Sequence, residues 1–102
     1  MRVVLCNTPQ KDAERIATAL VEKRLAACVN VIPAVLSIYR WKGAIEREFE
    51  STLLIKTRAE HVTALMSAIA ELHPYDVPEI VALTVEPNEV SPAYLQWLRD
   101  VT

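Results

Sequence analysis

Two long extended runs, residues 28–41 and 44–58, constrain the fold of this chain more than any other feature. Lys42-Gly43 joins them and contains the only glycine in the sequence. A two-residue loop with glycine is typical of a tight β-hairpin. Each strand would be roughly 14 residues long and span about 46 Å at about 3.3 Å per residue. The sequence therefore predicts an unusually long hairpin.

The register of this hairpin follows if Trp41 faces Ala44 across the turn. One face then carries aromatic and acidic side chains: Tyr39, Trp41, Glu46, Glu48 and Glu50. The other face is mostly apolar: Leu36, Ile38, Ile45, Arg47 and Phe49. Pro33 cannot donate a ladder hydrogen bond, so we expect a bulge or a local edge near it.

Apolar periodicity and turn residues predict the remaining elements. In order, we expect a strand over residues 2–7, a helix from Thr8-Pro9 to near Leu25, the hairpin, a helix from Thr57 to Pro74, a strand over 79–85 and a short helix from Ser91-Pro92. Thr8 and Ser91 are expected N-caps, and Thr57-x-x-Glu60 has the form of a capping box. The order β-α-β-β-α-β, followed by a short C-terminal helix, predicts an α+β ferredoxin-like split βαβ fold with a long central hairpin.

Composition favours one globular domain over residues 1–102, with 52% hydrophobic and 24% charged residues. A net charge of −2 argues against nucleic acid or an anionic membrane surface as partner. No apolar run reaches the roughly 18–20 residues of a membrane span, so we expect a cytoplasmic protein. Two cysteines, Cys6 and Cys28, lie in apolar runs and are expected to be free thiols in a reducing compartment.

The length of the hairpin predicts a homo-oligomer. A helix of roughly 14 residues spans about 21 Å, which covers less than half of such a hairpin. The uncovered end carries large apolar side chains, and burying each against a neighbouring subunit would contribute roughly 1.5–3 kcal/mol. The alternative is a strongly twisted hairpin that folds back on its own helices.

Several motifs resemble the CutA family, whose members are named for divalent-cation tolerance. They are Ala26-Ala27-Cys28-Val29-Asn30, Ser37-Ile38-Tyr39-Arg40-Trp41-Lys42-Gly43, Ile55-Lys56-Thr57, His73-Pro74-Tyr75, Pro78-Glu79-Ile80 and Tyr94-Leu95-Gln96-Trp97-Leu98. The resemblance runs along essentially the whole chain. It implies a ferredoxin-like fold, a homotrimer held together by the long hairpins, and a role in handling copper and other divalent ions.

The resemblance also implies a metal site at Cys6 and His73. Bacterial relatives with two adjacent histidines have the first where this chain has Leu72, so one imidazole is missing here. The expected topology places the start of the last strand near the end of the first, so Cys6 and His73 can approach each other. Thiolate and imidazole ligands suit copper or zinc. The alternative is that Cys6 is a small core residue and that His73 interacts with a helix end.

Other polar residues are weaker candidates. Glu46, Glu48 and Glu50 share a face and suit either a carboxylate metal site or salt bridges with Arg40 or Arg47 of another subunit. Cys28 is expected to pack in the core and His61 to be solvated. The aromatic residues Tyr39, Trp41, Tyr75 and Trp97 either pack in the core or line an intersubunit cleft.

No arrangement of residues predicts catalysis, and one glycine cannot form a phosphate-binding loop, so we do not expect an enzyme. The leading hypothesis is a trimeric, metal-binding divalent-cation tolerance protein of the CutA type. An alternative from another class is a trimeric signalling module that senses a small metabolite at its subunit clefts, resembling nitrogen-regulatory proteins. A third is a scaffold that anchors partners.

Overall fold

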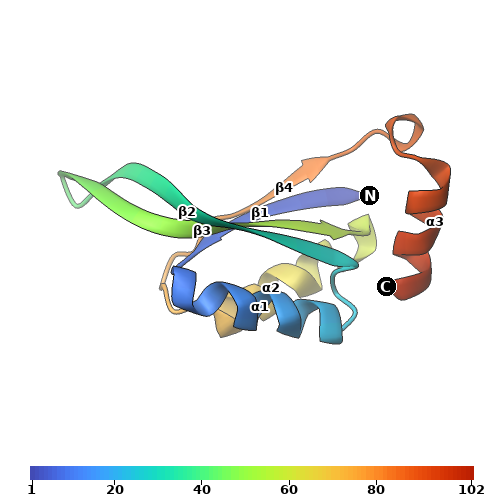
Figure 1. Cartoon of the computed structure of the whole chain (residues 1–102), viewed down its shortest axis with the longest axis horizontal. Helices are drawn as coiled ribbons and strands as arrows, with labels where there is room; N and C mark the ends of the chain where they lie inside the picture. Colours follow the sequence, from blue (N-terminus) through green and yellow to red (C-terminus); the bar gives the residue numbers. More distant parts are fainter.

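The computed structural model, which describes residues 1–102, is built on one four-stranded antiparallel sheet with strand order β2-β3-β1-β4. Its elements are β1 (Arg2–Thr8), α1 (Gln10–Glu22), β2 (Cys28–Trp41), β3 (Ala44–Thr57), a 3₁₀ turn η1 (Ala59–His61), α2 (Val62–Leu72), β4 (Ile80–Thr84), a 3₁₀ turn η2 (Pro87–Glu89) and α3 (Pro92–Val101). Helices α1 and α2 lie side by side on one face of the sheet (Figure 1). The α+β fold class and the order of elements predicted from the sequence are confirmed.

The β2–β3 hairpin projects beyond the helices, and α3 lies at the opposite end of the molecule (Figure 1). The register of the hairpin is the predicted one: Tyr39 pairs with Glu46 and Leu36 with Phe49. Lys42 and Gly43 have φ angles of 50° and 81°, so both turn residues adopt the positive φ that a type I′ hairpin turn requires.

The predicted irregularity beside Pro33 is also present, because the register shifts between Ile32 and Val35. Ala34 in this bulge has a φ of 57°, which is costly for a residue with a Cβ. The backbone N–H of Ala34 donates to Oε1 of Gln10 at 2.8 Å. The first residue of α1 therefore holds the bulge in place.

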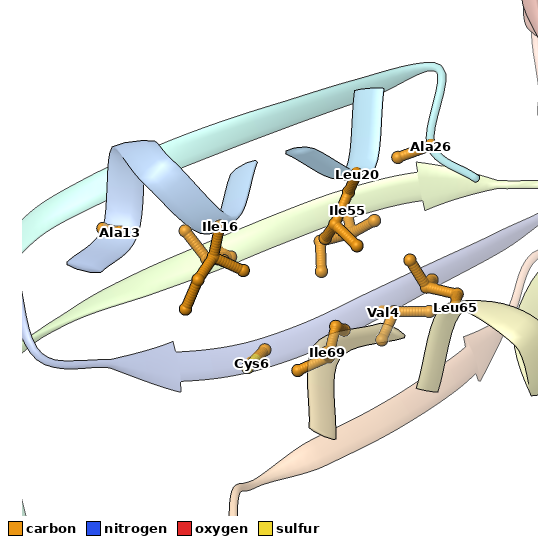
Figure 2. Packing of buried hydrophobic residues seen from close by; sticks show 10 residues of the cluster. Val4, Cys6, Ala13, Ile16, Leu20, Ala26, Ile55, Leu65 and Ile69 are labelled. Atoms are coloured by element: carbon orange, nitrogen blue, oxygen red, sulfur yellow. The ribbon is translucent and has the colours of Figure 1, made fainter. Parts of the chain in front are cut away.

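The core lies between the sheet and the two helices (Figure 2). Alternate side chains of β1 and β3 point toward α1 and α2, as the two-residue period of a strand requires. The largest fully buried members of this cluster are Ile16, Leu20, Leu53, Ile55, Leu65 and Ile69, together with Val4 and Cys6. Complete burial of each large side chain contributes roughly 1.5–3 kcal/mol.

The opposite face of the sheet is left uncovered by α1 and α2. The register puts Val3 beside Leu83 and Leu5 beside Val81 on this face. Val81 and Leu83 on the edge strand are 44% and 45% exposed. In the single chain, both this apolar sheet face and the apolar side chains of the hairpin are exposed to solvent.

Two of the predicted helix caps are wrong. The hydroxyl of Thr57 donates to the carbonyl of Leu25 at 2.6 Å, and Arg58 is the residue before the η1 turn. Thr8 donates to the carbonyl of Pro9 and caps no helical N–H. In both cases the hydroxyl donates to a backbone carbonyl and does not accept a hydrogen bond from an N–H group of the helix.

The remaining sequence predictions differ from the structure in small ways. Ser91 does precede Pro92 at the start of α3 but makes no side-chain cap bond. Helix α1 ends at Glu22, earlier than predicted, and the strand boundaries move by about one residue. None of the helices is both long enough and apolar enough to cross a membrane.

Candidate functional site

Cys6 and His73 come together at the end of β1. Cys6 is fully buried within the core cluster, and its neighbours across the sheet are Leu53 and Ile80. His73 follows α2 directly, and its N–H donates to the carbonyl of Ile69 at 2.8 Å. The Cys6 thiol, at 3.8 Å, and Nε2 of His73, at 2.7 Å, both contact the carbonyl oxygen of Asn7. The expected proximity of the two residues is present.

The hydrogen bonds of His73 define the state of its imidazole. Its Nδ1 accepts the backbone N–H of Tyr75 at 3.1 Å, so Nε2 must carry a proton to donate to Asn7. His73 as a whole is only 7% exposed. A metal ion could take Nδ1 only after the hydrogen bond from Tyr75 is broken.

The Cys6 thiol is held in its protonated form. Burial raises its pKa from 9.0 to about 12, and the negative charges of Glu79 and Glu50 add to the shift. Only the thiolate binds copper or zinc well. No group of three His, Cys, Asp or Glu side chains is placed to hold a metal ion. Cys6 and His73 therefore do not offer free metal ligands in this geometry, and the metal site remains a prediction.

A groove of about 910 Å³ lies beside these two residues. Its walls come from the hairpin, from Asn7 at the end of β1 and from the loop that connects α2 to β4. Five carboxylates line it, and no lysine, arginine or histidine does: Glu46, Glu48, Glu50, Asp76 and Glu79. The ion pairs of the chain are Arg15–Asp12 and Arg58–Glu60, so none of the five has a cationic partner.

Glu50 is the deepest of these carboxylates, with only 6% of its surface exposed. Its Oε2 accepts a hydrogen bond from the hydroxyl of Tyr75 at 3.2 Å. Burial and the charge of Glu50 raise the pKa of Tyr75 to about 12. The ring of Tyr75 also lies 4.8 Å from that of His73. A continuous set of contacts thus runs from Asn7 through His73 and Tyr75 to Glu50.

The aromatic residues divide between two places. Tyr39, Trp41 and Tyr75 line the groove of the single chain. The pKa of Tyr39 is raised, and the nearby carboxylate of Glu48 is the main cause. Trp97 is not part of this wall and pairs instead with Tyr94 on α3, at 5.5 Å between ring centroids. The groove therefore combines negative charge with three aromatic rings.

The other two candidates have structural roles. Nε2 of His61 lies 3.1 Å from the carbonyl of Thr102, which ties η1 to the end of α3. Cys28 is half-buried, on the sheet face opposite to Cys6, with Nζ of Lys56 at 4.0 Å from its sulfur. Neither residue lies in the groove.

Asp76 and Glu79 are the groove carboxylates that the sequence analysis missed. The pairing explains how they reach the site: β1 ends beside Ser51 of β3, and Cys6 faces Ile80 of β4. Glu50 and Glu79 therefore lie at the same end of the sheet, beside the end of β1. The predicted fold could have indicated the position of Glu79, because it placed the start of the last strand near the end of the first.

Comparison with known proteins agrees with this fold and with the motifs along the chain. A family model described as "CutA1 divalent ion tolerance protein" matches residues 2–101. The chain belongs to this family. The human Protein CutA is 52% identical over 93 residues, which are 91% of this chain and 51% of the human protein. This chain thus spans about half the length of the human, mouse and frog relatives it matches.

Bacterial members of the CutA1 family match over most of their length. The divalent-cation tolerance protein CutA of Thermus thermophilus is 48% identical over 98% of this chain and 96% of its own. A solved structure of that protein superposes with a TM-score of 0.94, covering 100% of this chain and 99% of the other. The apo "PII-like protein CutA" from Nostoc gives 0.95 at 41% identity, covering 100% and 97%. Relatives from rice and Arabidopsis are named chloroplastic.

Proposed function

We propose that this protein is a cytoplasmic homotrimer that binds divalent copper or zinc as part of divalent-cation tolerance, without enzymatic turnover. The observation that carries the proposal is the groove, where five carboxylates have no cationic partner. Such a concentration of one sign of charge in a concave site raises the local concentration of cations. Membership of a family named for divalent ions agrees with that electrostatic preference.

The trimer is supported by what the single chain leaves exposed. The hairpin carries Ile38, Ile45 and Phe49 at 58%, 59% and 64% exposure. The open sheet face adds Val81 and Leu83, and both edge strands, β2 and β4, have unpaired backbone groups. An apolar surface of this kind indicates a protein interface. A threefold assembly of the hairpins and open faces would bury it.

The proposed metal site has two alternative locations. The first is Cys6 with His73, where binding must remove a proton from the thiol and break the bond between His73 and Tyr75. The raised pKa makes the Cys6 thiolate about a thousandfold rarer than that of an ordinary cysteine at the same pH. The second is the carboxylate row Glu46, Glu48 and Glu50, which lines the groove. Because no three such side chains are placed to hold a metal ion within one chain, a further ligand would have to come from a neighbouring subunit.

Calorimetric titration of the purified protein with Cu²⁺ and Zn²⁺ separates these places. If Cys6 and His73 bind, Cys6→Ala abolishes binding, and Leu72→His strengthens it by adding the missing imidazole. If the carboxylates bind, Glu48→Gln weakens binding and Leu72→His has no effect. Glu89→Gln, an exposed carboxylate on η2, is the matched control. Absence of any saturable metal binding by the trimer would refute the proposal.

A second candidate function is sensing of a small metabolite. The groove volume of about 910 Å³ falls within the range of small-molecule sites, and aromatic rings form part of its wall. The Nostoc neighbour is described as PII-like. Thermal-shift measurement with small-molecule sets tests this function, and a stabilising ligand that fails to act on a groove variant would support it.

A further inference from the structure

We propose that Arg15 is a positioning residue for His73: it caps the end of α2, and it releases this end when its side chain turns fully to Asp12. Release of this cap would regulate the access of a metal ion to Nδ1 of His73. In that respect the inference rests on the proposed function and deepens it. The cap itself is a property of the contact between α1 and α2, and it can be tested without a metal ion.

The cap is a hydrogen bond between two helices. Helix α2 ends at Leu72, one residue before His73. The last four carbonyl groups of an α-helix have no partner within the helix, and a cation beside them is stabilising. Nη2 of Arg15 donates to the carbonyl of Leu72 at 3.1 Å. Because α1 and α2 lie side by side (Figure 1), an arginine of one helix reaches the end of the other.

The same nitrogen atom has a second acceptor. It donates to Oδ1 of Asp12, three residues earlier in α1, at 3.0 Å. Oδ2 of Asp12 is shielded from solvent and is the one buried side-chain nitrogen or oxygen atom without a hydrogen-bond partner in the chain. Nε and Nη1 of Arg15 are not used in either bond. Leaving a buried acceptor without a donor is unfavourable, so this arrangement does not satisfy the Asp12–Arg15 pair completely.

A second arrangement of Arg15 would satisfy that pair. A planar guanidinium can bind both oxygen atoms of a carboxylate through two of its nitrogen atoms. In Arg15 this arrangement would give Oδ2 of Asp12 a donor and remove Nη2 from the carbonyl of Leu72. The side chain of Arg15 is 52% exposed and has room to change rotamer, whereas that of Asp12 is only 15% exposed. Since one hydrogen bond replaces another, the two arrangements are close in free energy.

Release of Leu72 acts directly on the proposed metal position. The N–H of His73, the next residue, donates to the carbonyl of Ile69. Its Nδ1 is occupied by the N–H of Tyr75. When Arg15 releases the end of α2, the last turn loses a partner, and we expect both of these bonds to open more often. A metal ion that takes Nδ1 selects the released state, so its apparent affinity follows the fraction of released molecules.

The test is amide hydrogen exchange of the native protein, measured by NMR without a metal ion. Arg15→Met keeps a long side chain but removes every donor. It should speed exchange at His73 and Tyr75 by about 2- to 5-fold, the effect of losing one half-exposed hydrogen bond from a charged group. Arg15→Lys keeps a donor and should restore most of the protection. The matched control is Arg99→Met, which changes an exposed arginine of α3 that makes no ion pair and should leave exchange unchanged.

Asp12→Asn distinguishes a releasable cap from a rigid one. An asparagine side chain has only one acceptor atom, so the second arrangement is lost and exchange at His73 should slow by about twofold. The imidazole gives a separate spectroscopic signature. The ¹⁵N resonance of Nδ1 should move in Arg15→Met toward that of a nitrogen without a donor, and Arg15→Lys should reverse the change. Exchange of the amides of β1, the strand between β3 and β4, reports global unfolding and should stay constant.

Two outcomes would overturn the proposal: exchange in Arg15→Met no faster than in Arg99→Met, or faster exchange in Asp12→Asn. The second would show that Asp12 only holds Arg15 in place. A Zn²⁺ titration of the same variants separates this inference from the proposed function. An affinity that rises in Arg15→Met by the same factor as the exchange rate supports both. Responsive exchange without any Zn²⁺ binding refutes the metal proposal alone, and Zn²⁺ binding with unresponsive exchange refutes the cap alone.

Discussion

Replacement of Phe49 by serine should weaken the proposed trimer by a predictable amount. Phe49 is 64% exposed in the single chain and lies between the bulge and the turn of the hairpin. Full burial of such a side chain contributes roughly 1.5–3 kcal/mol, so burial of the exposed part contributes about 1–2 kcal/mol per copy. A trimer contains three copies, and the loss of about 3–6 kcal/mol raises its dissociation constant by about two to four orders of magnitude.

The assay is light scattering with size exclusion over a dilution series, supplemented by mass photometry at nanomolar concentration. The wild type should keep about three times the 11.5 kDa chain mass throughout, whereas Phe49→Ser should dissociate at a higher concentration. Val21→Ser is the control, because Val21 is 42% exposed but lies on α1, away from the hairpin. If both variants dissociate together, or neither does, the hairpin end is not at the interface.

Other predictions concern the thiols and the backbone. At pH 8 Ellman's reagent should reach Cys6 only after unfolding; rapid modification of Cys6 in the native protein would contradict its burial and raised pKa. Because the folded pKa of Cys6 lies above its ordinary 9.0, its contribution to stability is complete below about pH 9 and is lost toward pH 12; urea unfolding at pH 7 to 10.5 should therefore show a smaller decline for Cys6→Ala. Ala34→Gly should raise the free energy of unfolding by about 0.5–1 kcal/mol, because it relieves a φ of 57° while adding freedom to the unfolded chain. Gly43→Val should lower it by at least about 1–2 kcal/mol through its φ of 81° alone, since no atom lies within 4 Å of the added Cβ; an unfolding midpoint equal to that of Lys42→Ala would show that the turn is not of this type.

The hairpin could be predicted in detail because its determinants are local. A two-residue turn fixes which residues face each other, and the period of two then fixes the face of every side chain as far as the bulge. Pro33 marks the bulge because it lacks an N–H. That register alone places Tyr39, Trp41 and Glu48 on one face of the hairpin, without information from any tertiary contact.

The helix caps could not be predicted in the same way, because distant groups decide them. Thr57 and Glu60 have the spacing of a capping box, yet the hydroxyl of Thr57 donates to Leu25, 32 residues away. Likewise, the predicted fold placed Cys6 near His73, but the sequence did not indicate the protonation of the thiol or the hydrogen bonds of the imidazole. Burial of the thiol and the two backbone partners of the imidazole depend on how β1, α2 and the following loop pack.

His73 connects the two proposed binding places, and this link has a measurable consequence. Its Nδ1 accepts the N–H of Tyr75, whose hydroxyl donates to Glu50 in the groove. A metal ion that takes Nδ1 must break the first bond, so Tyr75 would move and Glu50 would lose its donor. Binding at the two places is then coupled, and thermodynamic linkage requires the same factor in both directions. The backbone amide resonance of Tyr75 should therefore shift when Zn²⁺ saturates the wild type and stay unchanged in His73→Ala. An unchanged resonance in the wild type would mean that a metal ion leaves the bond between His73 and Tyr75 intact.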